Sequence, residues 1–415
     1  MKKLFLVFVV IAIVSSSVQA KYSGGSGDAN DPYQIGSATD LLTLAGSTGD
    51  YNANFILIAD IDLASYTFTT AVIAPYIYNP DDGYFHGVPF IGVFDGNGHK
   101  ITNLFINITN DYGGDYLGLF GYLNYGEIKN LGVGNVNITS LQGSSIGGLT
   151  GENSCGIIIN CHSSGAINIV YNPTVCPAPT SICLGGLIGY NNYGKINSCS
   201  SSVSINGGHN THSLGGLAGY NYYGDINNSF ATGNVTGVSS FNSFGMDFGG
   251  LVGGNYNGII SQCWASGNVS GDAEQNARGN CCFGGLVGLN YYGGTISNCY
   301  ATGSVSVTSG IRGGYIGGLI GENGDYDSSA TNCYSTGAVI GNPYIVYGGL
   351  VGENSIGTVT ASFWDMDTSG LTFSDGGEGK TTAEMKTEST FTDAGWDFVG
   401  ETANGTEDIW WIIEN

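Results

Sequence analysis

One seven-residue string, Gly-Gly-Leu-x-Gly-x-Asn, recurs through the middle of this 415-residue chain. Its leucine marks eight copies, counting a divergent first one, and the spacings between these leucines run from 30 to 38 residues with a mean of 33. A repeat of this period predicts that each copy is one structural unit stacked on its neighbours, because such units bury their apolar faces only by stacking. The marking leucines are Leu119, Leu149, Leu187, Leu217, Leu251, Leu286, Leu319 and Leu350.

Each copy continues with short segments that favour β-strands. In the copy marked by Leu286, the segment Thr295–Gly303 is followed by the β-branched run Ser304–Val307. Such segments are four to eight residues long and bounded by Gly and Asn, which is typical of strands separated by turns. Three strands per repeat predict one coil per repeat. The fold class is therefore expected to be all-β, a right-handed parallel β-helix or β-solenoid of about eight coils of roughly 33 residues.

Residues at fixed offsets from the leucine indicate what each coil needs. Asn follows the leucine by four residues in seven copies, with Leu123 as the exception, and stacked Asn amides can hydrogen-bond along the axis. The paired glycines are expected to allow a positive φ or a close backbone approach. A further column alternates between Cys and Ser, which predicts a small and mostly buried site in each coil. Its members are Cys161, Cys199, Ser229, Cys263, Cys299, Cys333 and Ser362.

The string, followed by Ile-x-Asn-Cys-Tyr-Ala-Thr-Gly, resembles the GLUG repeat family over roughly Leu117 to Asp365. The flanking segments Ser23–Ile35 and Gly379–Met385 also resemble those of secreted proteins that carry this repeat. The resemblance implies a secreted or surface solenoid with an adhesin-like role and no defined reaction. In some IgA-cleaving metalloproteases the repeat is an accessory part, and this chain lacks the His-Glu-x-x-His zinc motif of their catalytic part.

The two ends of an open stack should be atypical, because each end exposes a strand edge and the core. Capping-box patterns predict short helices at Ser37–Ala45 and near Thr382–Lys386. The segment Phe55–Leu63 is expected to be a strand. The predicted organisation is a signal peptide at 1–20, an N-terminal cap with the first coils at 21–110, the GLUG-repeat solenoid at 111–365 and a C-terminal cap at 366–415.

The first twenty residues predict export. Lys2 and Lys3 precede the apolar run Leu4–Val14, and Val18-Gln19-Ala20 fits cleavage after Ala20. The run is short for a membrane span, and no later stretch reaches that length. We therefore expect a secreted or cell-surface protein without a transmembrane segment.

Charge narrows the possible partners. Two of the ten basic residues lie in the signal peptide, so the mature chain has 8 basic residues against 33 acidic ones. Nucleic acid binding relies on basic residues that neutralise phosphates, so this chain is expected not to bind nucleic acid. An extracellular glycan or protein surface is the expected partner, contacted by a monomer.

Sequence patterns for catalysis and metal binding are weak. Only two Arg are available for an acidic polymer, and the close acidic pairs lie at coil edges or caps: Asp60/Asp62, Asp81/Asp82, Asp325/Asp327 and Asp365/Asp367. The last two pairs offer oxygen ligands to Ca²⁺ without completing a binding loop, so no cofactor is expected and Ca²⁺ is a weak alternative. Non-catalytic adhesion or glycan contact is the leading function, followed by a structural cell-envelope role and then by a polysaccharide-degrading β-helix enzyme.

One disulfide is predicted in the longest gap between leucines. Cys176 and Cys183 lie in an insertion that also contains Pro173, Pro177 and Pro179. A crosslink in an exported loop of this kind restricts the unfolded chain, which favours a Cys176–Cys183 bridge.

An aromatic column follows the Cys/Ser column by one residue. Alternation along the strand from Cys299 places Ala301 and Val305 on one face and Tyr300 on the other. An outward-facing ladder of rings would suit stacking against sugar rings. Because Ile296 shares the parity of Tyr300, a bend near Gly303 that buries the rings is the competing interpretation. The candidate contact residues are Phe230, Trp264, Tyr300, Tyr334 and Phe363.

Overall fold

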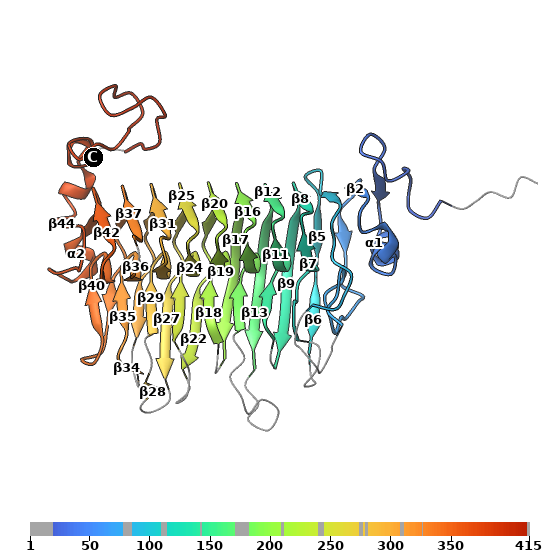
Figure 1. Ribbon diagram of the computed structural model, residues 1–415, viewed down its shortest axis with the longest axis horizontal. Coiled ribbons are helices and arrows are strands. Elements are labelled where there is room, and N and C mark those ends of the chain that lie inside the picture. The colour runs from blue at the N-terminus through green and yellow to red at the C-terminus, as the bar shows by residue number, and fades with distance from the viewer. Residues whose placement is uncertain are drawn as a thin grey trace, which may run out of the picture.

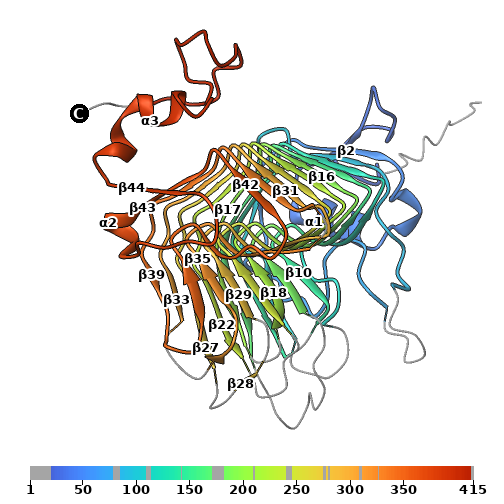
Figure 2. The ribbon, with the colours of Figure 1, turned by 60° about the vertical axis from the view of Figure 1, so that its left-hand side comes forward.

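In the computed structural model each repeat forms one coil of a parallel β-solenoid (Figure 1). Successive coils stack in register, so that four sheets run along the repeat region and two of them continue into the N-terminal region (Figure 2). The structure describes residues 20–77, 85–108, 114–141, 143–170, 182–208, 211–239, 245–273, 277–278, 281–307, 311–325 and 327–412. The predicted signal peptide lies, except for Ala20, outside the described residues.

The chain visits the four sheets in a constant order, and every strand pairing within them is parallel. Sheet 1 takes one strand from each copy of the repeat: β7 (Phe120–Asn124), β11 (Thr150–Ser154), β15 (Ile188–Asn192), β19 (Ala218–Tyr222), β24 (Val252–Tyr256), β30 (Val287–Tyr291), β36 (Ile320–Asn323) and β41 (Val351–Glu353). Sheet 2 follows and begins in the N-terminal region: β1 (Tyr33–Ile35), β2 (Asn54–Leu57), β4 (Val93–Asp95), β8 (Glu127–Lys129), β12 (Ile157–Ile159), β16 (Lys195–Asn197), β20 (Asp225–Asn227), β25 (Ile259–Ser261), β31 (Thr295–Ser297), β37 (Ser329–Thr331) and β42 (Thr358–Thr360).

Sheet 3 has the most strands, because each coil from the fourth to the seventh copy gives it two short strands, as do Lys100–Thr102 and Phe105–Asn107 in the N-terminal region. It contains β3 (Ile61–Asp62), β5 (Lys100–Thr102), β6 (Phe105–Asn107), β9 (Gly132–Ser140), β13 (His162–Ile169), β17 (Ser200–Gly207), β21 (Phe230–Ala231), β22 (Val235–Ser239), β26 (Trp264–Ala265), β27 (Val269–Ala273), β32 (Tyr300–Ala301), β33 (Val305–Val307), β38 (Tyr334–Ser335), β39 (Val339–Ile340), β43 (Phe363–Asp365) and β44 (Glu378–Lys380).

Sheet 4 closes each coil just before the next Gly-Gly-Leu. Its strands are β10 (Ser145–Gly147), β14 (Ile182–Gly185), β18 (Thr211–Gly215), β23 (Met246–Gly249), β29 (Cys281–Gly284), β35 (Tyr315–Gly317) and β40 (Val346–Gly348). A separate pair joins β28 (Ala277–Arg278) to β34 (Ile311–Arg312). The expectation of three strands per coil is therefore wrong. It missed sheet 4 because the chain before each Gly-Gly varies in length and sequence from copy to copy.

The glycines of the repeat serve close packing. A Cβ on Gly250 would lie 2.1 Å from the carbonyl oxygen of Gly285 in the next coil. A Cβ on Gly253, the third glycine of the string, would lie 2.6 Å from the carbonyl oxygen of Asp247 on sheet 4. Neither glycine has a positive φ. Of the two reasons expected for these glycines, close backbone approach is the one that applies.

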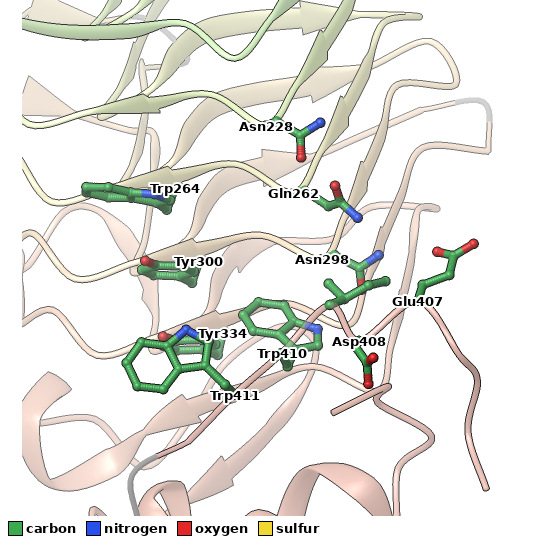
Figure 3. Close-up of a pocket in the computed structure, with 11 residues that line it drawn as sticks. Asn228, Gln262, Trp264, Asn298, Tyr300, Tyr334, Glu407, Asp408, Trp410 and Trp411 are labelled. Atoms are coloured by element: carbon green, nitrogen blue, oxygen red, sulfur yellow. The ribbon is translucent and has the colours of Figure 1, made fainter. Parts of the chain in front are cut away.

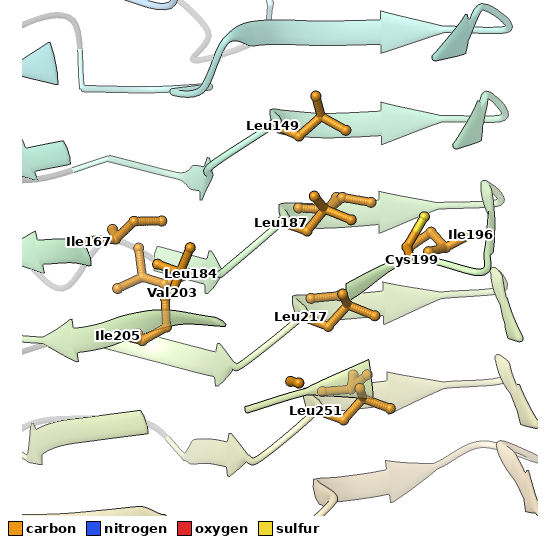
Figure 4. Packing of buried hydrophobic residues seen from close by; sticks show 14 of the residues in the cluster. Leu149, Ile167, Leu184, Leu187, Ile196, Cys199, Val203, Ile205, Leu217 and Leu251 are labelled. Carbon is orange, nitrogen blue, oxygen red and sulfur yellow. The ribbon is translucent and has the colours of Figure 1, made fainter. Parts of the chain in front are cut away.

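Three columns fill the interior. The repeat leucines stack one per coil and are fully buried, as the spacing predicts (Figure 4). The Asn side chains form a continuous ladder from Asn153 to Asn354, in which each Nδ2 donates to the Oδ1 of the next Asn at 2.7–2.8 Å. The Oδ1 of Asn153 is buried without a partner, because the preceding coil has Leu123 in this place. The Cys/Ser column is also buried, and backbone N–H groups donate to its sulfur and oxygen atoms along the stack.

Short helices cover both ends. At the N-terminal end, α1 (Ala38–Ala45) begins after Ser37, whose hydroxyl accepts from the Asp40 N–H as predicted, and η1 (Thr48–Asp50) follows it. The predicted strand 55–63 divides into β2 and β3 as the chain turns from sheet 2 to sheet 3. The C-terminal end carries α2 (Met366–Ser369), η2 (Glu384–Lys386) and α3 (Glu388–Thr392). The Thr381/Glu384 capping box forms, but it starts only the single turn η2.

Candidate functional site

The aromatic column lies on the outer face of sheet 3. Asn298 has a φ of +54°, and this left-handed residue turns the chain at the corner between sheets 2 and 3. After the corner, Cys299 and Ala301 point into the coil, whereas Tyr300 points outward and is half-buried. The corner residue resets the alternation, so Ile296 is buried although it shares the parity of Tyr300. The break at Gly303 between β32 and β33 leaves the alternation intact.

The rings stack on one another along the axis. Ring centroids are 4.4 Å apart between Phe230 and Trp264, 5.8 Å between Trp264 and Tyr300 and 4.9 Å between Tyr300 and Tyr334, and the planes differ by no more than 6° (Figure 3). The faces of the inner rings are thus covered by neighbouring rings, and only their edges reach the surface. Face-on stacking with sugars, the contact expected from the ladder, is therefore not offered by the middle rings.

Phe363 requires a correction. It continues the register after Tyr334 but is only 3% exposed, because Phe391 and Trp396 pack over it at centroid distances of 5.5 and 5.9 Å. The contact surface predicted from Phe230 to Phe363 ends at Tyr334, and Phe363 anchors the C-terminal cap.

A row of amide side chains runs beside the rings. Asn228, Gln262 and Asn298 occupy the same corner of three successive coils and have φ values of +50°, +54° and +54°. The first two are exposed and Asn298 is half-buried. The left-handed corner places these amides at the rim of the aromatic face, so each coil presents one amide and one ring.

The C-terminal segment forms the opposite wall. Trp396 is fully buried and its Nε1 donates to the Ala361 carbonyl at 2.8 Å, which fixes the segment to the last coil. Trp410 then packs against Trp396 at 4.6 Å, against Tyr334 at 5.9 Å and against Tyr300 at 6.2 Å. The exposed Trp411 follows at the surface (Figure 3).

Between this segment and the ladder lies a groove of about 480 Å³, a volume in the range of ligand sites. Two residues that line it, Asn298 and Trp410, each carry a buried polar atom without a hydrogen-bond partner, Oδ1 and Nε1 respectively. Such atoms cost stability unless a partner satisfies them. Burial raises the pKa of the Tyr300 and Tyr334 phenols, so both stay protonated and able to donate. The groove can therefore hold a ligand rich in hydroxyl groups.

The other predicted site residues lie elsewhere. Cys183 is buried in β14, whereas Cys176 lies outside the described residues, so the Cys176–Cys183 bridge stays a prediction. Asp365 caps α2 by accepting from the Asp367 and Thr368 N–H groups, and Asp325 accepts from the Tyr291 hydroxyl at 2.6 Å. Within the described ranges, no three His, Cys, Asp or Glu side chains are grouped so as to hold a metal ion.

The structure also brings together acidic residues that the sequence pattern did not single out. Asp247 on sheet 4 is 4% exposed and Glu322 on sheet 1 accepts from the Cys282 thiol at 3.3 Å, all in the corner between these sheets. Burial and the mutual proximity of the two carboxyl groups raise the pKa of Asp247. Aligning the copies on their leucines would have revealed this corner, because Asp247 and Cys282 both lie four residues before the leucine of their copy.

Comparison with known proteins identifies the repeat. The model of the GLUG motif matches residues 210–236, 245–270, 279–308 and 312–340. A protein of Evansella cellulosilytica provisionally named a Gly-rich membrane protein is 34% identical over 95% of this chain, and halomucin of Haloquadratum walsbyi is 31% identical over 35% of it. This chain covers 46% of the first relative and 2% of the second, so it spans less than half of either.

Two solved structures align with much of this chain. A proposed immunoglobulin A1 protease of Bacteroides ovatus aligns with 70% of this chain and 80% of its own, at 21% identity and a TM-score of 0.46. An IgA1 protease aligns with 79% of this chain and 21% of its own, at 14% identity and a TM-score of 0.42. None of the helices in the described part of this chain has the length and apolar character that a membrane crossing requires.

Proposed function

Because the chain is a GLUG-repeat solenoid, we propose that it acts outside the cell as a non-catalytic scaffold that contacts glycans through the groove beside its aromatic ladder. The hydrophobic N-terminus at 1–20 supports export. The names of the relatives, a membrane protein and a halomucin, support a place at the cell surface.

The observation that carries the proposal is the composition of the groove. Its walls combine the edges of Trp264 and Tyr300 with Trp410 and with amide side chains, and two of its buried polar atoms lack partners. Carbohydrates present many hydroxyl groups on a partly apolar frame, and this combination complements such a lining.

Binding of the purified mature chain to a glycan array tests the proposal. We expect retention of at least one class of linear glycan, and a loss of about tenfold or more in affinity in the double variant W264A/Y300A. The matched control is Y193A/Y223A, which removes an exposed pair of rings stacked at 4.9 Å elsewhere on the solenoid. Absence of glycan binding, or equal loss in both variants, would contradict the proposal.

Hydrolysis of a polysaccharide is the second candidate, and the carboxyl pair Asp247/Glu322 is the observation that favours it. Acid–base hydrolysis uses two carboxyl groups, one with a raised pKa. Release of reducing ends from polysaccharides by the mature chain, lost in D247N and in E322Q, would favour this candidate over a scaffold.

A further inference from the structure

Among the described residues that line the groove, two are acidic and none is basic. Glu407 and Asp408 line one end, and both are exposed on the C-terminal segment. The Asp408 carboxylate accepts from the Gly400 N–H at 3.3 Å, which fixes its position, and the Glu407 carboxylate points in a different direction from the same segment (Figure 3). Since no Lys or Arg lines the groove, an anionic glycan would meet uncompensated repulsion there.

The groove is also periodic. Trp264, Tyr300 and Tyr334 pair in register across three coils, and an amide accompanies the first two rings one coil at a time. Neighbouring strands of a sheet are about 4.8 Å apart, which is close to the length of one pyranose residue in an extended chain. A linear polymer parallel to the solenoid axis would therefore meet an equivalent ring edge and amide at each step.

The exposed edges decide which interactions the rings can offer. An aromatic ring is negative on its faces and positive at its edge. With the faces covered by stacking, the edges of Trp264 and Tyr300 attract sugar oxygens, and cation–π contact with these rings is blocked. Attraction for a positive group then comes from the carboxylates of Glu407 and Asp408 and from the exposed ring of Trp411.

We infer that the groove binds a linear polysaccharide that carries primary amino groups, with its chain along the solenoid axis and ammonium groups at Glu407 and at Asp408. This inference rests on the proposed function and names its ligand class. Charge-assisted hydrogen bonds from an ammonium group to carboxylates are about twice as strong as neutral ones. The amino groups therefore make the groove prefer this polysaccharide over neutral ones. The ring edges and amides contribute binding energy that neutral sugars share.

The test compares two oligosaccharides that differ in whether their amino groups are acetylated, and adds an anionic oligosaccharide. Chitosan oligomers, fully N-acetylated chitin oligomers and oligogalacturonates of two to six residues are titrated into the mature chain at pH 6, and intrinsic tryptophan fluorescence reports binding. We expect the chitosan oligomers to bind about tenfold more tightly than the acetylated ones, with affinity rising up to three or more residues. Oligogalacturonates should bind weakest.

The double variant E407Q/D408N should reduce the preference for chitosan to less than about twofold while binding of the acetylated oligomers is retained. The matched control D327N/D393N removes two exposed carboxylates outside the groove and should keep the preference. Equal binding of chitosan and chitin oligomers, or a preference that survives E407Q/D408N, would overturn the inference and leave the groove a neutral-glycan site. If the wild-type chain binds none of the oligosaccharides, that result contradicts the proposed function itself.

Discussion

The inner and outer columns of the same coils differ in how strictly they repeat. The inner columns carry Leu and Asn in nearly every coil, and a one-coil exception such as Leu123 leaves a buried oxygen without a partner. The outer column changes from His162 and Ser200 to Phe230, Trp264 and Tyr300 along the stack. Repetition is strictest at positions that close the coil, and in this outer column aromatic side chains begin at Phe230 and continue toward the C-terminal segment. The proposed binding site therefore lies on a column that varies from coil to coil.

Tyrosine substitutions at two adjacent serines should give the largest difference in stability between the inner and outer columns. Ser201 points inward and is 1% exposed, and its Oγ would lie 2.1 Å from a Cβ on Gly186, so there is no space beside it. S201Y should destabilise the fold by at least about 4 kcal/mol or prevent folding, because a ring cannot enter this packed site. S200Y, one residue earlier on the outer face, should extend the ring stack over Phe230 with a change within about 0.5 kcal/mol.

Urea unfolding followed by circular dichroism measures both variants. Similar stability of S200Y and S201Y would mean that the inner and outer faces are not distinguished by packing.

The Asn ladder gives the next largest effect. N221A should lower the free energy of unfolding by about 3 kcal/mol, because it removes the ladder bonds to Asn191 and Asn255 and leaves Asn255 Oδ1 buried without a donor. N354A, at the partly exposed end of the ladder, should cost about 1 kcal/mol, since water can replace the lost partner. Chemical unfolding compares the two, and an equal cost at both positions would argue against a continuous buried ladder.

The corner between sheets 1 and 4 differs from the outer face of sheet 3, because side chains that point outward in this corner are buried. Burial raises the pKa of Glu152 to about 7. The folded chain then binds a proton that the unfolded chain releases above its ordinary pKa. The contribution of Glu152 to stability is therefore fully present below about pH 4.5 and is lost as pH rises to about 7, by about 3 kcal/mol.

Thermal unfolding between pH 4.5 and 8 should show a smaller decrease for E152Q than for the wild-type chain. The control D327N/D393N removes exposed charge and should keep the wild-type slope. An unchanged slope in E152Q would mean that Glu152 is not protonated in the folded state.

The sequence predicts the parts of this structure that repeat. The period of the leucines predicts one coil per copy, and the recurring Asn predicts the ladder, because a column needs the same residue in each copy. The outward direction of Tyr300 depends on a left-handed Asn298, which alternation alone does not reveal. The docking of Trp410 on Tyr334 is a single long-range contact with no periodicity, so no pattern in the chain marks it.

A crystal structure of the mature chain with a bound linear oligosaccharide tests the central claim most directly. The account predicts sugar residues in the groove, with hydroxyl groups at Asn298 Oδ1 and Trp410 Nε1 and with the chain along the edges of Trp264 and Tyr300. An oligosaccharide found in the corner between sheets 1 and 4, beside Asp247 and Glu322, with the groove empty, would contradict it.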